Sequence, residues 1–178
     1  RGTVAAAAGD RVIDRLTVHH TATPAVAGGR EVDAAFVAES HRRRGLGLGT
    51  GDARDCAYHF VILPDGRVQA GRPLEYWGSG TRSGEDNLHS VGVALVGDFV
   101  RGGRGPTPAQ MDALESLALG AFSEYGFDAR SVRGHREVSA SACPGALLDL
   151  DALRMSLAAA STAGRRGHWP APTEEGSA

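Results

Sequence analysis

The sequence contains no lysine, so all 19 of its Lys and Arg positions are arginines. A reaction that needs a lysine amine as nucleophile or proton carrier is therefore excluded for this chain. Acidic residues number 21, and the formal net charge is −2. Nucleic-acid-binding domains normally carry a surplus of basic residues, so we expect no nucleic-acid partner.

Cysteine is also scarce, with only Cys56 and Cys143 among 178 residues. Two cysteines are too few for a disulfide scaffold, so the fold must depend on an apolar core. Apolar residues make up 42% of the chain, which is enough for one such core. No apolar run approaches the length of a membrane-spanning helix, and we therefore expect no membrane insertion.

The pattern of apolar residues predicts a mixture of strands and helices. We expect strands at residues 11–19, 56–63, 67–70 and 91–96, and helices at residues 31–43, 108–125 and 146–159. This order predicts a single layered α/β domain with a central mixed β-sheet flanked by helices. The domain is expected to occupy residues 11–160, between an N-terminal extension (1–10) and a flexible C-terminal tail (161–178).

The clearest helix signal begins at Thr107. Thr107 can cap a helix, Pro108 suits its first position, and Gln110 can complete a capping box. An apolar stripe follows and ends at Gly126, a residue type that commonly terminates helices.

Three residues far apart in the sequence form a candidate metal site. His19 ends the first expected strand, and His135 and Cys143 lie in the segment GHREVSASACPG. Two imidazoles and one thiolate suit zinc, and three protein ligands would leave a fourth position for water or substrate. The residues alone also allow a structural or surface role for the histidines and a small buried hydrophobe at Cys143.

Five short motifs occur in an order that resembles a known family. They are His19-His20-Thr21-Ala22, Asp55-Cys56-Ala57-Tyr58-His59-Phe60, Asp65-Gly66-Arg67-Val68, Ser90-Val91-Gly92-Val93 with Gly97-Asp98-Phe99, and Gly134-His135-Arg136-Glu137 with Ala142-Cys143-Pro144-Gly145. Together they resemble the zinc-dependent N-acetylmuramoyl-L-alanine amidases of type 2, a group that includes phage lysozyme-amidases and peptidoglycan recognition proteins. The similarity runs from about residue 16 to residue 157.

The resemblance implies a hydrolase that cleaves the amide between N-acetylmuramic acid and L-alanine in bacterial peptidoglycan. It implies zinc as the cofactor, held by His19, His135 and Cys143, with His20 at a variable position. Tyr58 matches the family's active-site tyrosine, which would stabilise the oxyanion. Ser141 stands where family members often have lysine or threonine, and its hydroxyl is the second catalytic candidate.

Other positions are candidates for substrate contact or proton transfer. His41 and Asn87 match places near the substrate groove, although His41 could equally pack on a helix face. The segment Gly78-Ser79-Gly80-Thr81 lacks a histidine that animal recognition proteins often carry there. Glu137 is either a proton carrier or one half of a solvated pair with Arg136.

Alternation along the expected strand places Cys56 on the face of Tyr58 and His59 on the opposite face, so we expect His59 to be structural. Cys56 belongs to the core in this interpretation, with a place near the metal as its alternative. The main rival function is a non-catalytic peptidoglycan-binding module, and the presence of Cys143 favours catalysis. A purely structural zinc site is disfavoured because no clear fourth ligand is present. An extracellular or cell-wall location is expected. A phage endolysin is the alternative.

Overall fold

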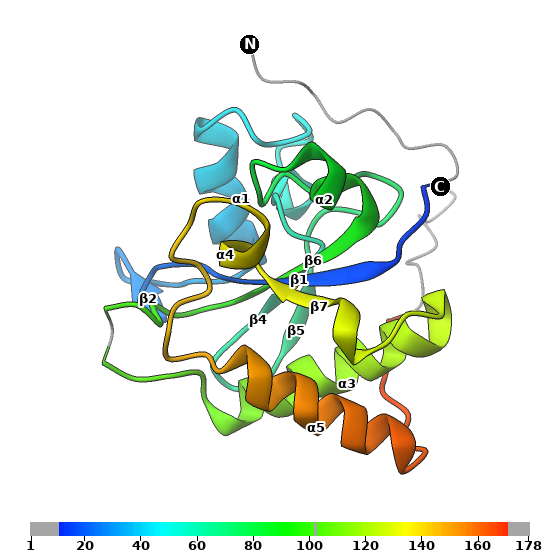
Figure 1. The fold of residues 1–178 in the computed structure, drawn as a ribbon. Coiled ribbons are helices and arrows are strands. Elements are labelled where there is room, and N and C mark those ends of the chain that lie inside the picture. Colours follow the sequence, from blue (N-terminus) through cyan, green and yellow to red (C-terminus); the bar gives the residue numbers. More distant parts are fainter. Residues whose placement is uncertain (1–10, 102, 171–178) are drawn as a thin grey trace.

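The structure, a computed structural model, describes residues 11–101 and 103–170. Its main strands are β1 (Arg15–His20), β4 (Phe60–Ile62), β5 (Val68–Ala70), β6 (Ser90–Leu95) and β7 (Val132–Gly134). They form one sheet in the order β5-β4-β6-β1-β7 (Figure 1). β4, β6, β1 and β7 run parallel, and β5 pairs with β4 in the antiparallel sense. The predicted central mixed sheet is therefore confirmed.

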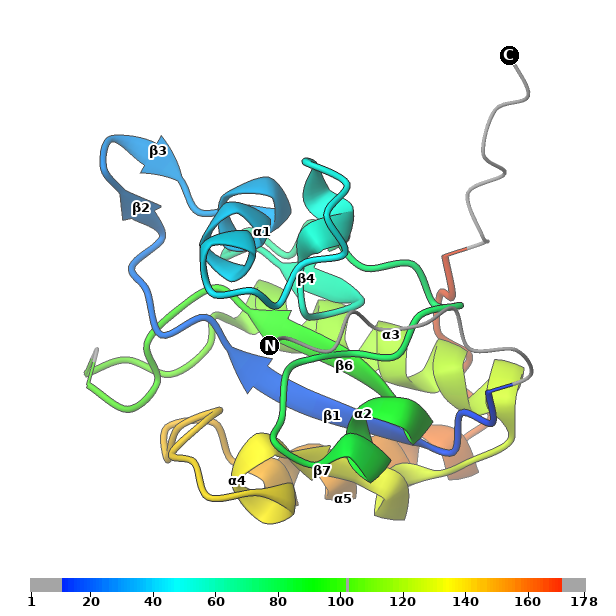
Figure 2. The same cartoon turned by 90° about the horizontal axis from the view of Figure 1, so that it is seen from above.

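Helices cover both faces of this sheet. The helices are α1 (Ala34–Arg43), α2 (Gly84–His89), α3 (Pro108–Tyr125), α4 (His135–Val138) and α5 (Leu150–Thr162). Figure 1 shows α1 and α2 on one side of the sheet and α3 and α5 on the other. A small hairpin, β2 (Val26–Ala27) with β3 (Arg30–Glu31), lies beside α1 in Figure 2. No helix within the described ranges has the length and apolar character that a membrane crossing requires.

The two faces of β1 differ in character, because successive side chains of a strand point to opposite sides. Leu16 and Val18 belong to the larger apolar cluster, which includes residues of α3 and α5. Thr17 and His19 alternate with them and point to the other face. Their register partners on β6 are Gly92 and Ala94. These two small residues leave room for side chains above the sheet.

Helix α3 has the boundaries that the sequence predicts. The Thr107 hydroxyl accepts a hydrogen bond from the Gln110 amide, and the Gln110 side chain accepts one from the Thr107 amide. At the other end Gly126 adopts a left-handed conformation with φ of 78°. Both signals are local, so tertiary contacts were not needed to locate them.

The strand predicted for residues 56–63 is shorter than expected, because only Phe60–Ile62 is a strand. The chain enters this segment from a 3₁₀ turn at Ala53–Asp55. The Asp55 carboxylate accepts hydrogen bonds from the backbone amides of residues 49, 50 and 51 and from Arg42. These bonds fold the loop before Asp55 back on itself. Similarly, α1 begins at Ala34 because Asp33 caps it.

Two segments differ from the expectation. The segment between β5 and β6, where no helix is expected, contains α2, whose first turn is capped by Ser83. In the expected tail 161–178, α5 continues to Thr162, and the Trp169 ring packs edge-on against Phe60 and Tyr125. Apolar contacts therefore place part of the segment after α5 against the core. The N-terminal extension 1–10 and residues 171–178 lie outside the described residues.

Candidate metal centre

His19, His135 and Cys143 come together on the face of the sheet that carries Thr17. One ligand atom from each residue lies within 4.8 Å of the other two. The His19 Nδ1 atom is 3.6 Å from the Cys143 sulfur, and the two imidazole centroids are 4.9 Å apart. Two nitrogen donors and one sulfur donor are the ligand types that zinc prefers, so the donor set fits this metal.

The neighbouring histidines His19 and His20 have different surroundings. His20 points to the opposite face, where its Nδ1 accepts a hydrogen bond from the Phe99 amide at 3.1 Å. Its backbone N–H still reaches the donor set, because it donates to the Cys143 sulfur at 3.3 Å. Of the pair, the structure therefore brings only the His19 ring to the other two candidate ligands.

Burial determines the protonation of the donor set. It is the largest cause that holds the pKa of His19 well below 6.5, and the neighbouring His135 lowers that pKa further. The pKa of His135 is also lowered, again mainly by burial. Both imidazoles are therefore neutral at pH 7, with a lone pair for a metal. Burial raises the pKa of the Cys143 thiol to about 11.

Strand β7 and helix α4 position His135, and the sequence patterns did not predict either element. Glu137 closes the first turn of α4 by accepting a hydrogen bond from the Gly134 amide at 2.8 Å. The same carboxylate forms an ion pair with Arg154 of α5. Glu137 is therefore paired with α5. Arg136 does not pair with Glu137 and instead donates to the Gly145 carbonyl. Neither interpretation of Glu137 made from the sequence anticipated this arrangement.

Ser141 lies two residues before Cys143, and its oxygen accepts a hydrogen bond from the Cys143 amide at 3.1 Å. The loop is further held by the Arg136 amide, which donates to the Cys143 carbonyl at 2.7 Å. The Ser141 hydroxyl therefore helps to shape the cysteine loop, and its hydrogen remains a donor.

Tyr58 and His41 form one side of the candidate centre. The Tyr58 ring centroid is 4.7 Å from that of His19 and 5.1 Å from that of His41. Burial raises the pKa of the Tyr58 phenol, so the group is a neutral donor at pH 7. The His41 Nδ1 accepts a hydrogen bond from the Ala57 amide, and burial is the main cause that lowers the pKa of His41 to about 4. His41 is therefore neutral, with its proton on Nε2.

Asn87 does not offer its side-chain amide to the centre in this structure. Its oxygen accepts bonds from the Thr81 amide and hydroxyl, and its nitrogen donates to the Thr81 carbonyl. These bonds hold the segment that contains Gly80. A Cβ atom at Gly80 would lie 3.0 Å from His19 Nε2 and 2.9 Å from Tyr58 Cε1.

The backbone at Gly80 thus lies directly against the site. The sequence motifs indicate only that this segment lacks a histidine. They do not predict that Gly80 contacts the site. A glycine between a serine and a threonine carries no signal of such a contact on its own.

His59 and Cys56 have the surroundings of structural residues. Both His59 ring nitrogens have backbone partners, Gly92 and Tyr76. Cys56 is fully buried in the smaller apolar cluster and is not part of the donor set.

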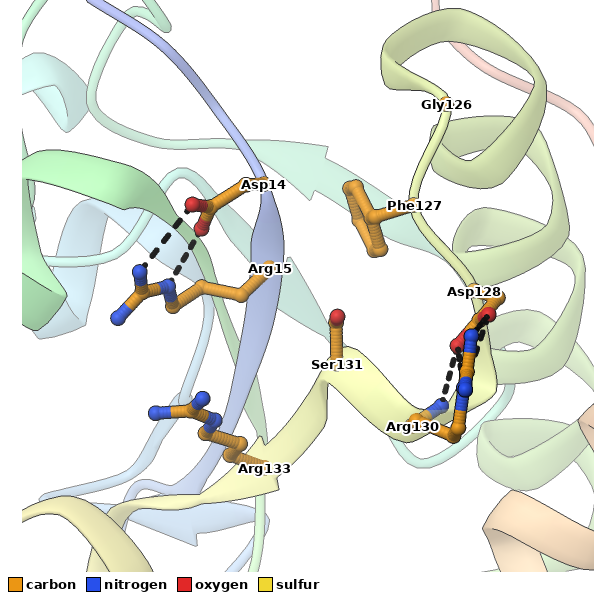
Figure 3. A pocket seen from close by; sticks show the side chains of 8 residues that line it. All are labelled: Asp14, Arg15, Gly126, Phe127, Asp128, Arg130, Ser131 and Arg133. Atoms are coloured by element: carbon orange, nitrogen blue, oxygen red, sulfur yellow. Dashed lines mark hydrogen bonds and ion pairs between the residues drawn. The ribbon is translucent and has the colours of Figure 1, made fainter.

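A separate depression of about 540 Å³ lies where β1 begins (Figure 3). It is lined by Asp14, Arg15, Gly126, Phe127, Asp128, Arg130, Ser131 and Arg133. Two of its three arginines form ion pairs with neighbouring aspartates, Arg15 with Asp14 and Arg130 with Asp128. None of the candidate metal ligands lines this depression, so cavity size does not locate the candidate centre.

The fold and the site together define a class of protein: a layered α/β domain with two imidazoles and a thiol converging on one face of a mixed sheet. The chain belongs to the N-acetylmuramoyl-L-alanine amidase family, whose model matches residues 9–146.

Known relatives include phage and animal proteins. The endolysin of Escherichia phage T7 is 34% identical over 134 residues, which cover 74% of this chain and 80% of that protein. Peptidoglycan-recognition protein 1 of Holotrichia diomphalia is 31% identical over 136 residues, which cover 75% of this chain and 64% of that protein. Among solved structures, the N-acetylmuramoyl-L-alanine amidase LysC of Clostridium intestinale superposes with a TM-score of 0.68. It is 26% identical, and the match covers 88% of this chain and 93% of that one.

Proposed function

We propose that this chain is a zinc-dependent hydrolase that cleaves the amide between N-acetylmuramic acid and L-alanine in bacterial peptidoglycan. The observation that carries the proposal is the convergence of His19, His135 and Cys143 within 4.8 Å, beside Tyr58, in a member of the amidase family. Endolysin relatives support action on the bacterial cell wall, and a phage endolysin is one role that fits.

His19, His135 and Cys143 would hold the zinc ion through two neutral nitrogens and one sulfur. A zinc ion held there would supply a Lewis acid for the scissile carbonyl and would lower the pKa of a water molecule. The ligand residues come from β1, from the start of α4 and from the loop after it. The Gly134 capping bond from Glu137 and the loop bonds of Arg136 keep the last two ligands in place.

Tyr58 would donate a hydrogen bond to the oxyanion that develops as the amide carbonyl is attacked. Its phenol remains protonated at neutral pH, and its ring is packed between His19 and His41. A donor held in place before the reaction needs no rearrangement when charge develops. Ser141 is proposed as a second donor, because its oxygen is occupied by the Cys143 amide while its hydrogen is available.

His41 is proposed as a substrate contact through its Nε2 proton. The Ala57 amide occupies its other nitrogen, which fixes the ring and the tautomer. Asn87 is proposed to act on the substrate only indirectly, because its amide is bonded to Thr81.

The second candidate function is a non-catalytic peptidoglycan-binding module. Relatives named as peptidoglycan-recognition proteins favour it, because such a name describes binding without cleavage. Hydrolysis is favoured for this chain because it has a thiol in the donor set and a tyrosine beside it.

The deciding experiment is incubation of the purified protein with peptidoglycan, with and without a chelator. The released ends would be identified by mass spectrometry. Stem peptides that begin with L-alanine, lost on chelation and restored by zinc, are the expected result. Intact peptidoglycan that nevertheless retains the protein in a pull-down would instead support the binding module.

A further inference from the structure

Arg72 follows strand β5 and is only 2% exposed. Within the described part of the chain, its guanidinium has no carboxylate bonded to it. It donates to the Trp77 carbonyl at 3.1 Å, to the Ser79 hydroxyl at 2.7 Å and to the Leu46 carbonyl. The remaining Nε–H group is buried without a partner. All three acceptors of this cation are therefore neutral groups.

Such a buried cation is costly for folding. Removing a charge from water carries a penalty that neutral acceptors repay only in part, and an apolar side chain of similar volume is often at least as stable. Burial accordingly lowers the pKa of Arg72. The contribution of this arginine is therefore better sought in the geometry that its bonds impose than in stability.

The bonds of Arg72 join two segments that flank Tyr58. Leu46 lies in the loop after α1, whereas Trp77 and Ser79 lead directly into Gly80. The Arg72 backbone amide also donates to the Tyr58 carbonyl at 2.8 Å. One residue thus connects the loop after α1, the segment that carries Tyr58 and the segment that contains Gly80.

The position of Gly80 is sensitive to small movements. A Cβ atom there would lie 3.0 Å from His19 Nε2, so the backbone has little free space above the donor set. A shift of this segment would change the room available to a substrate beside His19 and Tyr58.

We propose that Arg72 is a positioning residue for the reaction, because it holds Gly80 at a set height above His19 and Tyr58. This inference rests on the proposed function. Misplacing reacting groups by about 1 Å can slow an enzyme on the order of 100-fold, which is the scale of effect that such a residue controls.

Arg11 provides a matched control on the same loop. Its guanidinium also donates to backbone carbonyls, those of Leu74, Tyr76, Leu88 and Ser90. Its acceptors in this loop, Leu74 and Tyr76, precede those of Arg72, and none of its acceptors is in the loop after α1. Arg11 therefore secures the same loop without joining the two segments at the centre.

The experiment compares Arg72→Met, Arg72→Lys and Arg11→Met with the zinc-loaded wild type, using a soluble disaccharide-peptide fragment as substrate. For Arg72→Met we expect kcat to fall about 10- to 100-fold, with KM within about threefold and zinc content unchanged. Arg72→Lys, which can reach fewer acceptors, should give an intermediate kcat. Arg11→Met should lower Tm and keep kcat. Wild-type kcat in Arg72→Met, or in Arg72→Lys if the former does not fold, would overturn the proposal.

Amide hydrogen exchange supplies a readout that does not depend on activity. The amides of Leu46, Gly78 and Ser79 are bonded to His41, Asn87 and Ala57 across the joined segments. We expect faster exchange at these three amides in the Arg72 variants and not in Arg11→Met. If the wild type proves inactive on peptidoglycan, the proposed function fails. Unchanged exchange in the Arg72 variants would separately refute the positioning role.

Discussion

At the scale of single residues, chemistry in this site depends on which way each side chain points. His19 and His20 are adjacent, yet one ring lies 3.6 Å from the Cys143 sulfur and the other bonds the Phe99 amide. The alternation of a β-strand explains the difference. His19 lies opposite a small residue of β6, Ala94.

The assignment of the metal ligands can be tested through the zinc content of variants. We expect Cys143→Ser to lose most of its zinc and its activity, because a hydroxyl is a far weaker zinc ligand than a thiolate. His20→Asn is the control, since an amide oxygen can still accept the bond from the Phe99 amide. It should retain about one zinc per chain by elemental analysis. Near-normal zinc in Cys143→Ser would contradict the ligand assignment.

Tyr58→Phe removes one hydroxyl and leaves the ring packing beside His19 and His41. Losing a single oxyanion donor costs about 3–4 kcal/mol, so kcat should fall roughly 100- to 1000-fold. Zinc content and Tm should stay at wild-type values. Steady-state kinetics on a muropeptide would measure the effect. A loss of less than about threefold would mean that Tyr58 does not stabilise the transition state.

At the scale of elements, some segments follow local signals and others follow distant contacts. Helix α3 follows its capping box and Gly126, so its bounds were predictable. The loop before β4 depends on Asp55, whose carboxylate accepts hydrogen bonds from three backbone amides and from Arg42. Apolar periodicity describes which residues are buried, and it contains no information on where a buried carboxylate will bond.

Asp55→Asn should destabilise the fold and flatten its acid dependence. Burial alone would raise the pKa of Asp55, but hydrogen bonds from Arg42 and the backbone amides outweigh it and hold the pKa well below 3.8. A lowered pKa stabilises the fold above the unfolded-state pKa of about 3.9, and this stability is lost as pH falls through the folded-state value.

The expected loss for Asp55→Asn is about 1–3 kcal/mol for each buried donor left without an acceptor. Denaturant unfolding at pH 7 and near pH 3, without added zinc, would show a gap between wild type and variant that narrows at the lower pH. Asp112→Asn, on the exposed side of α3, is the control and should change stability by less than about 0.5 kcal/mol. An equal gap at both pH values would contradict this account.

At the scale of the whole molecule, the two faces of the sheet have different tasks. Helices α3 and α5 cover one face of the sheet, and α1 and α2 lie on the other (Figure 1). The first face carries the larger apolar cluster, and the second carries the candidate centre. The segment after α5 belongs to the first of these, since Trp169 contacts Phe60 and Tyr125. The chain therefore uses residues beyond its last helix to complete the core.

Trp169→Ala should lower stability without impairing the site. The ring is partly buried, so we expect a loss of about 2–3 kcal/mol, below the range for fully buried aromatic residues. Thermal unfolding should show a lower Tm, while kcat measured well below Tm stays unchanged. Met155→Ala is the control, because Met155 is 74% exposed and its loss should cost little. An unchanged Tm in Trp169→Ala would indicate that this segment does not support the core.

The sequence by itself determined the chemistry available to this protein and its locally coded elements. It contains the two imidazoles, the thiol and the tyrosine in family order, and it encodes β1, β5, β6 and α3 through short-range patterns. Each of these patterns depends on residues within a few positions of each other, so it can be read without a fold.

Only the tertiary structure decided how these groups meet. His19 and Cys143 are separated by 124 positions, and their approach depends on the pairing of β7 with β1. The contact of Gly80 with His19 and the bond from Arg72 to the Leu46 carbonyl likewise join segments that are distant in the sequence. Such long-range contacts follow from packing and from the need to satisfy buried polar groups, which no local pattern records.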